Sequence, residues 1–254
     1  MSSNPQNTAF VLVPGSFSPT SFYEKVIPLL ENKGYLAVPT ALQSAGERPQ
    51  GPATFEEDVS FIAATIQKLA DEGKDVVLTM NSYGGFPGTE ASKGLSKKGR
   101  EANGLKGGII ALVYLASFLP AVGLSLRASM GDNLPDSIKK AGDYMTMNYD
   151  EDWKNIFSDM SEEDGRHYMN LMPNHSTISF SGRLEYPGYL HVPTTYLLTE
   201  EDKIIPPESQ EQMVQMVEGL GGKPKVVRKK SGHVPMLSIP DEIMSVLVEA
   251  AEGQ

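Results

Sequence analysis

The chain has 254 residues, of which 40% are hydrophobic and 21% charged, as is typical of a globular protein with a sizeable core. Its 32 acidic residues outnumber its 22 basic ones, so a nucleic-acid backbone or an anionic membrane would be repelled. The absence of cysteine excludes disulfide bonds and thiolate metal sites. We therefore expect a small-molecule partner, and neither nucleic acid nor membrane.

The amino-terminal segment has no basic patch, and no apolar run in the chain is long enough to span a bilayer. These patterns predict neither a signal peptide nor a membrane-spanning helix, and they favour a cytoplasmic protein. No repeat or linker marks a second domain. Residues 1–254 are therefore expected to form a single domain, as a monomer or a homodimer.

Strand-like and helix-like segments alternate along the chain. Six segments are candidate strands, and most of them are rich in Val, Ile, Leu or Tyr without polar alternation, as expected of parallel strands covered on both faces. They are Ala9–Val13, Tyr35–Pro39, Asp75–Met80, Gly108–Ser117, Thr194–Thr199 and Pro224–Lys229. This alternation predicts an α/β fold with a mostly parallel, doubly wound sheet flanked by helices.

Helices are predicted from apolar residues that recur at helical spacing. Thr54 and Glu57 have the spacing of a capping box at the start of one of them. The predicted helices are Phe22–Glu31, Phe55–Ala70, Glu208–Gly219 and Pro240–Glu252.

One segment, about residues 119–190, interrupts the alternation. It contains several prolines and many Met and Tyr residues, and no convincing strand. Two short helical patterns, Trp153–Met160 and Glu162–Leu171, lie within it. We expect a helical cap insertion that lies over one end of the sheet.

The strand Asp75–Met80 runs into the turn Asn81-Ser82-Tyr83-Gly84-Gly85. A strand, a sharp turn that carries a serine, and a helix form a nucleophile elbow, usually written G-x-S-x-G. Met80 stands where the leading glycine is expected. Taken alone, the motif leaves open a second interpretation, in which Ser82 only caps the following helix.

His233 follows the last predicted strand, at the sheet edge where a general base would sit, although it could also be a buried histidine bonded to a backbone carbonyl. Of the other histidines, His167 is expected to be solvated, and His175 and His191 have no acid at a suitable strand end.

Three acids, Glu200, Glu201 and Asp202, follow the strand Thr194–Thr199 and compete for the role of the carboxylate that orients the base. The chain order of serine, acid and histidine is the order of a hydrolase triad on this kind of sheet.

The first strand ends in Pro14-Gly15-Ser16-Phe17. An oxyanion requires two N–H donors, one from the residue after the nucleophile and one from an early strand-end loop. Tyr83 supplies the first. The Ser16 or Phe17 amide is the candidate for the second, because Gly15 allows a close backbone approach, although the same residues also form common turns.

Together, the segments 11–16, 81–85, 202–206 and 231–233 resemble small α/β-hydrolases, in particular the group of plant methylesterases and hydroxynitrile lyases with its fungal relatives. The resemblance covers nearly the whole chain, including the cap. It implies Ser82 as nucleophile, His233 as base, and Asp202 as the acid, because the family's acid stands four residues before a proline, here Pro206. It further implies that the Ser16 and Tyr83 amides form the oxyanion hole, and that no cofactor or metal is needed.

The resemblance implies a serine hydrolase, a carboxylesterase or lactonase that acts on a small, largely apolar ester through an acyl-enzyme. Aromatic and Met side chains are expected to line its pocket, although such residues in a cap are often core. They are Phe17, Phe118, Trp153 and Phe157, together with Tyr144, Met145 and Met172.

Two alternatives remain open. Met80 and Asn81 depart from the family's Gly and His, and they keep open a cyclase or lyase that uses the same pocket without hydrolysis. Val234 and Gly15 stand where hydroxynitrile lyases carry a lysine and a threonine, which disfavours release of cyanide. A ligand receptor without turnover is the other alternative, and the three candidate triad residues argue against it.

Overall fold

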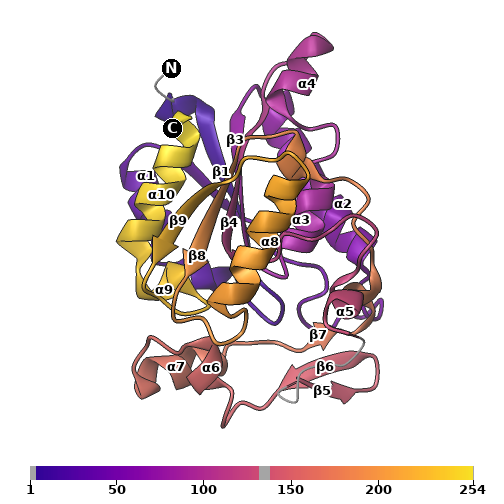
Figure 1. Cartoon of the computed structure of the whole chain (residues 1–254), viewed down its shortest axis with the longest axis vertical. Helices are drawn as coiled ribbons and strands as arrows, with labels where there is room; N and C mark the ends of the chain where they lie inside the picture. Colours follow the sequence, from indigo (N-terminus) through magenta and orange to yellow (C-terminus); the bar gives the residue numbers. More distant parts are fainter. Residues whose placement is uncertain (1–3, 132–137, 254) are drawn as a thin grey trace.

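Six parallel strands form the central sheet of the computed structural model, which describes residues 4–131 and 138–253 (Figure 1). Their order across the sheet is β2-β1-β3-β4-β8-β9. The strands are β1 (Thr8–Val13), β2 (Leu36–Pro39), β3 (Asp75–Ser82), β4 (Gly108–Ser117), β8 (Thr194–Thr199) and β9 (Lys225–Lys229). All six predicted strands and their parallel arrangement are confirmed.

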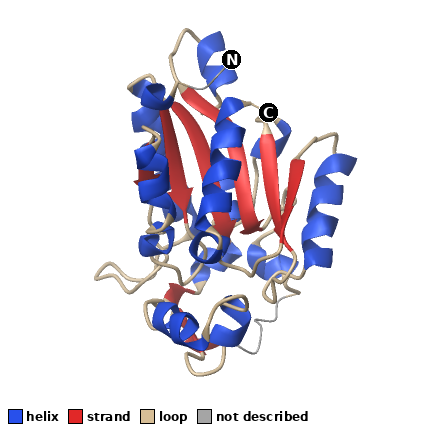
Figure 2. Cartoon of the chain, turned by 90° about the vertical axis from the view of Figure 1, so that its left-hand side faces the viewer, coloured by secondary structure: helices blue, strands red, loops and turns tan. Residues whose placement is uncertain are grey.

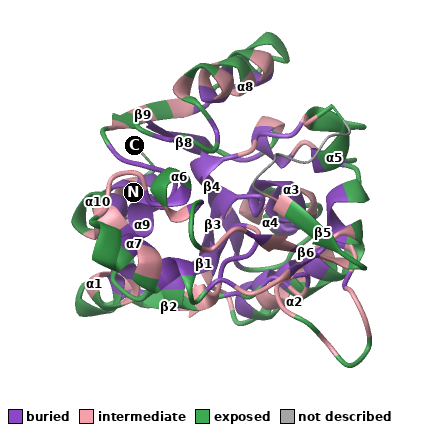
Figure 3. Ribbon diagram, turned by 90° about the horizontal axis from the view of Figure 1, so that it is seen from below, coloured by how far each residue is buried: buried purple, intermediate pink, exposed green. Residues whose placement is uncertain are grey.

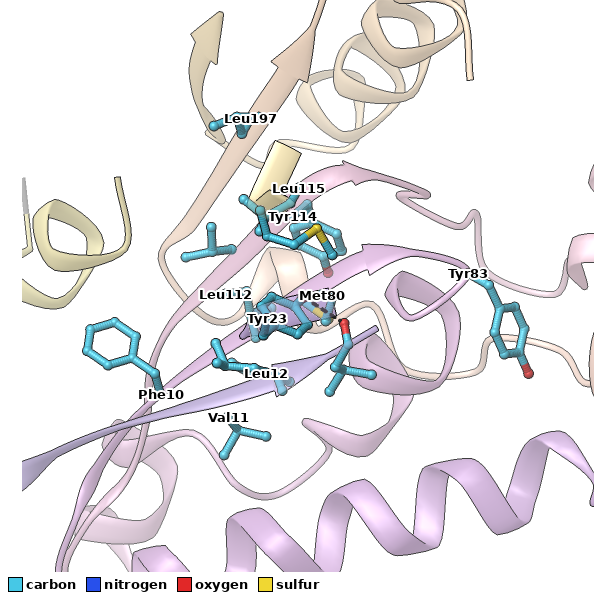
Figure 4. Close-up of a cluster of buried hydrophobic side chains, with 14 of the residues drawn as sticks. Phe10, Val11, Leu12, Tyr23, Met80, Tyr83, Leu112, Tyr114, Leu115 and Leu197 are labelled. Carbon is cyan, nitrogen blue, oxygen red and sulfur yellow. Dashed lines mark hydrogen bonds between the residues drawn. The ribbon is translucent and has the colours of Figure 1, made fainter. Parts of the chain in front are cut away.

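The core lies on both faces of the four central strands. Every residue of β1 and β8 is buried, whereas the edge strands β2 and β9 are partly exposed (Figure 3). Side chains such as Phe10 and Leu12 on β1, and Leu112 and Leu115 on β4, fill the space around the sheet (Figure 4). Burial on both faces explains why these strands are apolar without alternation.

Helices cover both faces of the sheet (Figure 2). On one face, α1 (Val26–Asn32) packs against α10 (Pro240–Glu252), and on the other α2 (Phe55–Asp71) packs against α3 (Gly85–Ala91). Another helix, α8 (Pro207–Gly219), packs on β8. The other short helices outside residues 119–190 are η1 (Pro5–Asn7), η2 (Thr20–Tyr23), α4 (Lys97–Ala102) and α9 (Pro235–Ser238). No helix in the described ranges is both long and apolar enough to cross a membrane.

The structure confirms the predicted start of α2 and divides another predicted helix into two. The capping box is confirmed, because the Thr54 side chain accepts from the Glu57 amide while the Thr54 amide donates to Glu57 Oε2, at 2.9 Å. The predicted helix Phe22–Glu31 is instead two pieces, η2 and α1. Pro28 lacks an N–H group and fits only within the first turn of a helix, so α1 begins at Val26.

The cap lies beyond the carboxyl ends of the strands, at the bottom of Figure 1. It contains a three-stranded antiparallel sheet of β5 (Ile138–Ala141), β6 (Tyr144–Met147) and β7 (His175–Ser176). Its helices are α5 (Leu126–Ser129), α6 (Trp153–Ile156), α7 (Glu162–Met169), η3 (Ile178–Ser181) and η4 (Gly188–Leu190).

The prediction of a purely helical cap is therefore wrong. Strands of two to four residues are too short for their alternation to be recognised, and β5 is mostly exposed. The Gly142-Asp143 pair, which joins β5 to β6 as a two-residue hairpin turn, was the usable signal in the sequence.

Helix α3, which follows the turn at Ser82, packs closely on the Met80 side chain. The Met80 side chain is completely buried under α3, and a Cβ atom on Gly88 of α3 would lie 2.5 Å from Met80 Sδ and 2.7 Å from Met80 Cγ. Gly88 thus makes the room that the larger residue at position 80 requires.

We predict that Gly88→Ala lowers the free energy of unfolding by about 1–3 kcal/mol, because the added methyl group overpacks Met80. Glycine-to-alanine changes inside helices otherwise stabilise by about 0.5–1 kcal/mol. Gly219→Ala, at the last residue of α8, is the control, because no atom outside the adjacent backbone of its own helix lies within 4 Å of its added Cβ. Urea denaturation of both variants tests the fit, and an equal gain in stability would contradict it.

Candidate active site

Ser82 ends β3 in the left-handed backbone region, with φ at 51°. Its carbonyl oxygen accepts hydrogen bonds from Ser117 Oγ at 2.8 Å and from the Phe118 amide at 3.2 Å. Helix α3 begins directly afterwards at Gly85, where a side chain would overlap the Phe118 carbonyl. Because Gly84 occupies the N-cap position of α3, Ser82 does not cap this helix.

A continuous hydrogen-bonded chain joins Ser82, His233 and Asp202. Ser82 Oγ lies 2.9 Å from His233 Nε2, and His233 Nδ1 lies 2.8 Å from Asp202 Oδ2. All three residues are buried. Because a carboxylate can only accept, Nδ1 carries the proton and the Nε2 lone pair faces the Ser82 hydroxyl.

The loop after β8 separates the three candidate acids. Asp202 is buried, and its Oδ1 accepts from the amides of Ile204 at 2.7 Å and Ile205 at 2.9 Å. Glu200 and Glu201 are exposed. Only Asp202 therefore faces His233, held by two backbone donors.

Sequence reasoning missed Gln210, a completely buried residue of α8. Its Nε2 donates to the Ile205 carbonyl at 2.7 Å, and its Oε1 accepts from the Thr199 amide at 3.1 Å. Gln210 thereby fixes both ends of the loop that carries Asp202. A single glutamine in the first turn of a helix gives no sequence signal for such a role.

Asn81 also has a defined position. Its Nδ2 donates to the Leu115 carbonyl at 2.9 Å and to the His233 carbonyl at 3.1 Å. The residue before Ser82 therefore links the elbow to the histidine loop. Its replacement of the family's histidine leaves the alignment of Ser82 and His233 intact.

The loop after β1 lies against the elbow, where a Cβ atom on Gly15 would be 2.8 Å from Ser82 Cβ. Phe17 has φ at 59°, and its amide donates to His175 Nδ1 at 3.3 Å. In the described part of the chain, the amides of Ser16 and Tyr83 have no acceptor. Of the two candidates in this loop, Ser16 is therefore the one with a free N–H group.

A buried carboxyl group, Asp58 of α2, lies beneath Tyr83. The Tyr83 hydroxyl lies 3.2 Å from Asp58 Oδ2, and Ser44 donates to Asp58 through its amide at 2.9 Å and its hydroxyl at 2.6 Å. Burial raises the pKa of Asp58 to about 6, against the opposing effect of these hydrogen bonds. Burial raises the pKa of Tyr83 well above its ordinary value, and the negative charge of Asp58 raises it further. The Tyr83 hydroxyl therefore stays protonated. The sequence signal for Asp58 was a carboxylate within the apolar face of a helix.

Two cavities meet at Ser82. The smaller has a volume of about 70 Å³ and the larger about 500 Å³. Both are lined by Ser16, Ser82, Ile138 and Ile204. The smaller is further lined by Phe17, Asn81, Met147, Ile156, Met172, His233 and Val234, and the larger by Phe86, Phe118, Leu126, Met130, Phe180, Met213 and Met216, among others.

Three of the predicted pocket residues, Phe17, Phe118 and Met172, line these cavities. The other predicted residues line neither cavity, in contrast to the expectation that they line the pocket. They are Tyr144, Met145, Trp153 and Phe157. Phe157 packs edge-on against Phe22, and Trp153 packs on Gly165. Their helical spacing reflects packing within the cap and of the cap on the domain below.

The other histidines lie away from this chain of hydrogen bonds. His167 and His191 are exposed, and His175 is completely buried in the cap. Among residues 4–131 and 138–253, no group of three or more His, Asp or Glu side chains is arranged to hold a metal ion.

Comparison with known proteins gives the family. A sequence model described as the Alpha/beta hydrolase family matches residues 10–246. The chain is 31% identical over 244 residues to Probable hydrolase R7 of a Phoma species, an alignment that covers 95% of this chain and 97% of that protein.

Solved structures share the fold. A pyrethroid hydrolase from Sphingobium faniae superposes with a TM-score of 0.75 at 21% identity, over 97% of this chain and 98% of that one. The methylesterase MES16 from Arabidopsis superposes with a TM-score of 0.72 at 20% identity, over 96% and 98% of the two chains. At these identities the likeness concerns the fold alone.

Asp58 makes stability depend on pH in a specific direction. Its pKa of about 6 lies above the unfolded value of 3.8, so the folded state binds its proton more tightly. The resulting stabilisation is full below about pH 4 and is lost as the pH rises through about 6. Relative to wild type, Asp58→Asn should therefore gain about 2 kcal/mol of stability between pH 4 and pH 7, because most of the difference of about two pKa units is expressed in this range.

Urea denaturation at several pH values measures this difference. Asp71→Asn is the matched control, because the hydrogen bond from Arg100 holds the pKa of Asp71 below its usual value. The control should show a smaller change of opposite sign. A difference between wild type and Asp58→Asn that is constant over this pH range would contradict the assignment.

Proposed function

Because this chain belongs to the alpha/beta hydrolase family, we propose that it is a serine carboxylesterase or lactonase that acts on a largely apolar ester. The observation that carries the proposal is the hydrogen-bonded chain Ser82–His233–Asp202, with distances of 2.9 and 2.8 Å. Beside it lie the amides of Ser16 and Tyr83, which have no acceptor among the described residues.

Acylation follows from these positions. Ser82 Oγ attacks the ester carbonyl while His233 Nε2 takes its proton, and Asp202 stabilises the imidazolium that forms. The Ser16 and Tyr83 amides donate to the oxyanion of the tetrahedral intermediate. Collapse of this intermediate breaks the bond to the alcohol oxygen, which receives the proton from His233.

Deacylation repeats the same steps with water. His233 takes a proton from water as its oxygen attacks the acyl-enzyme, and then returns a proton to Ser82 as the acid is released. Each proton that enters His233 leaves it within the same half-reaction. The chain's own side chains and amides suffice for the cycle.

The two cavities give the ester an orientation. His233 belongs to the lining of the smaller cavity and not of the larger. Because His233 must protonate the leaving alcohol, the alcohol occupies the space of about 70 Å³ and the acyl group the space of about 500 Å³. The proposed substrate is therefore an ester of a bulky apolar acid with a small alcohol.

Two isomeric esters test this orientation. Methyl octanoate places its long chain on the acyl side, whereas heptyl acetate places it on the alcohol side. We expect kcat/KM to be at least about tenfold higher for methyl octanoate, because each buried methylene contributes about 0.8 kcal/mol only where it fits. Equal rates, or preference for heptyl acetate, would contradict the orientation.

Ser82→Ala is the control for the mechanism and should lower kcat by about 1,000-fold or more. Turnover in isotopically labelled water separates hydrolysis from the alternatives. A hydrolase places solvent oxygen in the acid, while a cyclase or lyase that uses this pocket releases product without it. Unchanged activity in Ser82→Ala would reject the proposed function.

A further inference from the structure

His175 is the buried histidine that the proposed mechanism does not use. It lies on β7 of the cap, completely inaccessible to solvent, and its ring contacts Phe17, Tyr83 and Phe180 with centroid distances of 5.2, 5.3 and 5.3 Å. Its Nδ1 accepts from the Phe17 amide at 3.3 Å. A cap residue thus reaches the loop that carries one proposed oxyanion donor.

The hydrogen bonds assign both ring nitrogens. Because Nδ1 accepts from an amide, it carries no proton, and Nε2 is the protonated nitrogen. Nε2 lies 3.1 Å from Ser179 Oγ, which itself donates to the Ser176 carbonyl at 2.8 Å and therefore has a lone pair for His175. Burial lowers the pKa of His175 to about 3, so the ring stays neutral.

His175 Nδ1 accepts from Phe17, whose backbone has a conformation that residues with a side chain usually avoid. Phe17 has φ at 59°, a left-handed backbone that costs a residue with a side chain about 1–3 kcal/mol. Its amide would also be an unpaired buried donor without His175. The bond to Nδ1 satisfies the Phe17 amide, whereas the adjacent Ser16 amide has no acceptor within residues 4–131 and 138–253.

The same histidine also supports the second donor. Tyr83 lies beyond the end of β3, apart from the side chains that fill the sheet core (Figure 4). Its ring stands edge-on to His175 at 80°, and its hydroxyl lies 3.1 Å from the Ser179 carbonyl. Tyr83 is thereby packed against the segment of the cap that also binds His175 Nε2.

We propose that His175 is the positioning residue of the oxyanion site, through which the cap fixes the Ser16 amide, by way of Phe17, and packs against Tyr83. The inference rests on the proposed function, because it gives these two amides their role. Substrate does not contact His175 in this account. Its contribution is the alignment of donors that act in the transition state.

Asn and Leu are the matched substitutions at position 175, because they have the same shape and only Asn places an acceptor at the δ position. For His175→Leu we expect kcat to fall by about 10- to 100-fold with KM unchanged, as for a misaligned oxyanion donor. His175→Asn should recover most of that loss. His191→Leu, a change at an exposed histidine, should leave activity unaltered.

Thermal unfolding of each variant verifies that the protein is folded when kcat is measured. Wild-type kcat in His175→Leu would overturn the proposal. An equal loss in His175→Asn and His175→Leu would also overturn it, because the acceptor would then be irrelevant.

A second measurement does not depend on activity. Nitrogen-15 NMR of the imidazoles, with the His175 signal identified by its loss in His175→Leu, should show a neutral ring protonated on Nε2 at pH values near 5. A ring protonated on Nδ1 would overturn the contact with Phe17. Failure of the proposed function is seen separately, as unchanged turnover in Ser82→Ala or as no ester turnover.

Discussion

The backbone of Ser82 is the constraint on which the site depends. A left-handed φ of 51° points the hydroxyl out of the sheet, and it persists because Ser117 and Phe118 bind its carbonyl oxygen while glycines permit the close approach of neighbouring loops. Such strain of about 1–3 kcal/mol is maintained only where surrounding packing determines it. The strands on either side of β3, which are buried apart from the half-buried Ile110 of β4, supply that packing.

Two polar systems meet at this turn. One runs from Ser82 through His233 to Asp202 and the loop braced by Gln210, and in the proposed mechanism it moves protons. The other runs from Asp58 through Tyr83 to the cap, and it moves no proton to substrate. In our account the cap therefore does more than enclose the acyl group, because its inner edge supports the donors that stabilise negative charge.

Much of this could be predicted from the sequence. Fully buried strands have continuous apolar runs, so the sheet could be predicted, with Ser82 and His233 as candidates at strand ends. The choice of Asp202 over Glu200 and Glu201 rests on the family resemblance and not on the strand pattern. The strands of the cap have only two to four residues, which is too little for periodicity, and the Gly142-Asp143 turn was the one signal for the hairpin of β5 and β6. Gln210 and His175 act through contacts between distant segments, which local patterns do not encode. For Asp58 the local pattern shows only a carboxylate on an apolar helix face, and not its partners Ser44 and Tyr83.

The central claim is that Ser82 is an activated nucleophile. The most direct measurement is intact mass after incubation with a fluorophosphonate, for the wild type and for Ser82→Ala. Our account predicts one covalent adduct on the wild type and none on the variant, because only a serine deprotonated by His233 attacks phosphorus rapidly. A folded wild-type protein that acquires no adduct, or an equal adduct on both proteins, would contradict it.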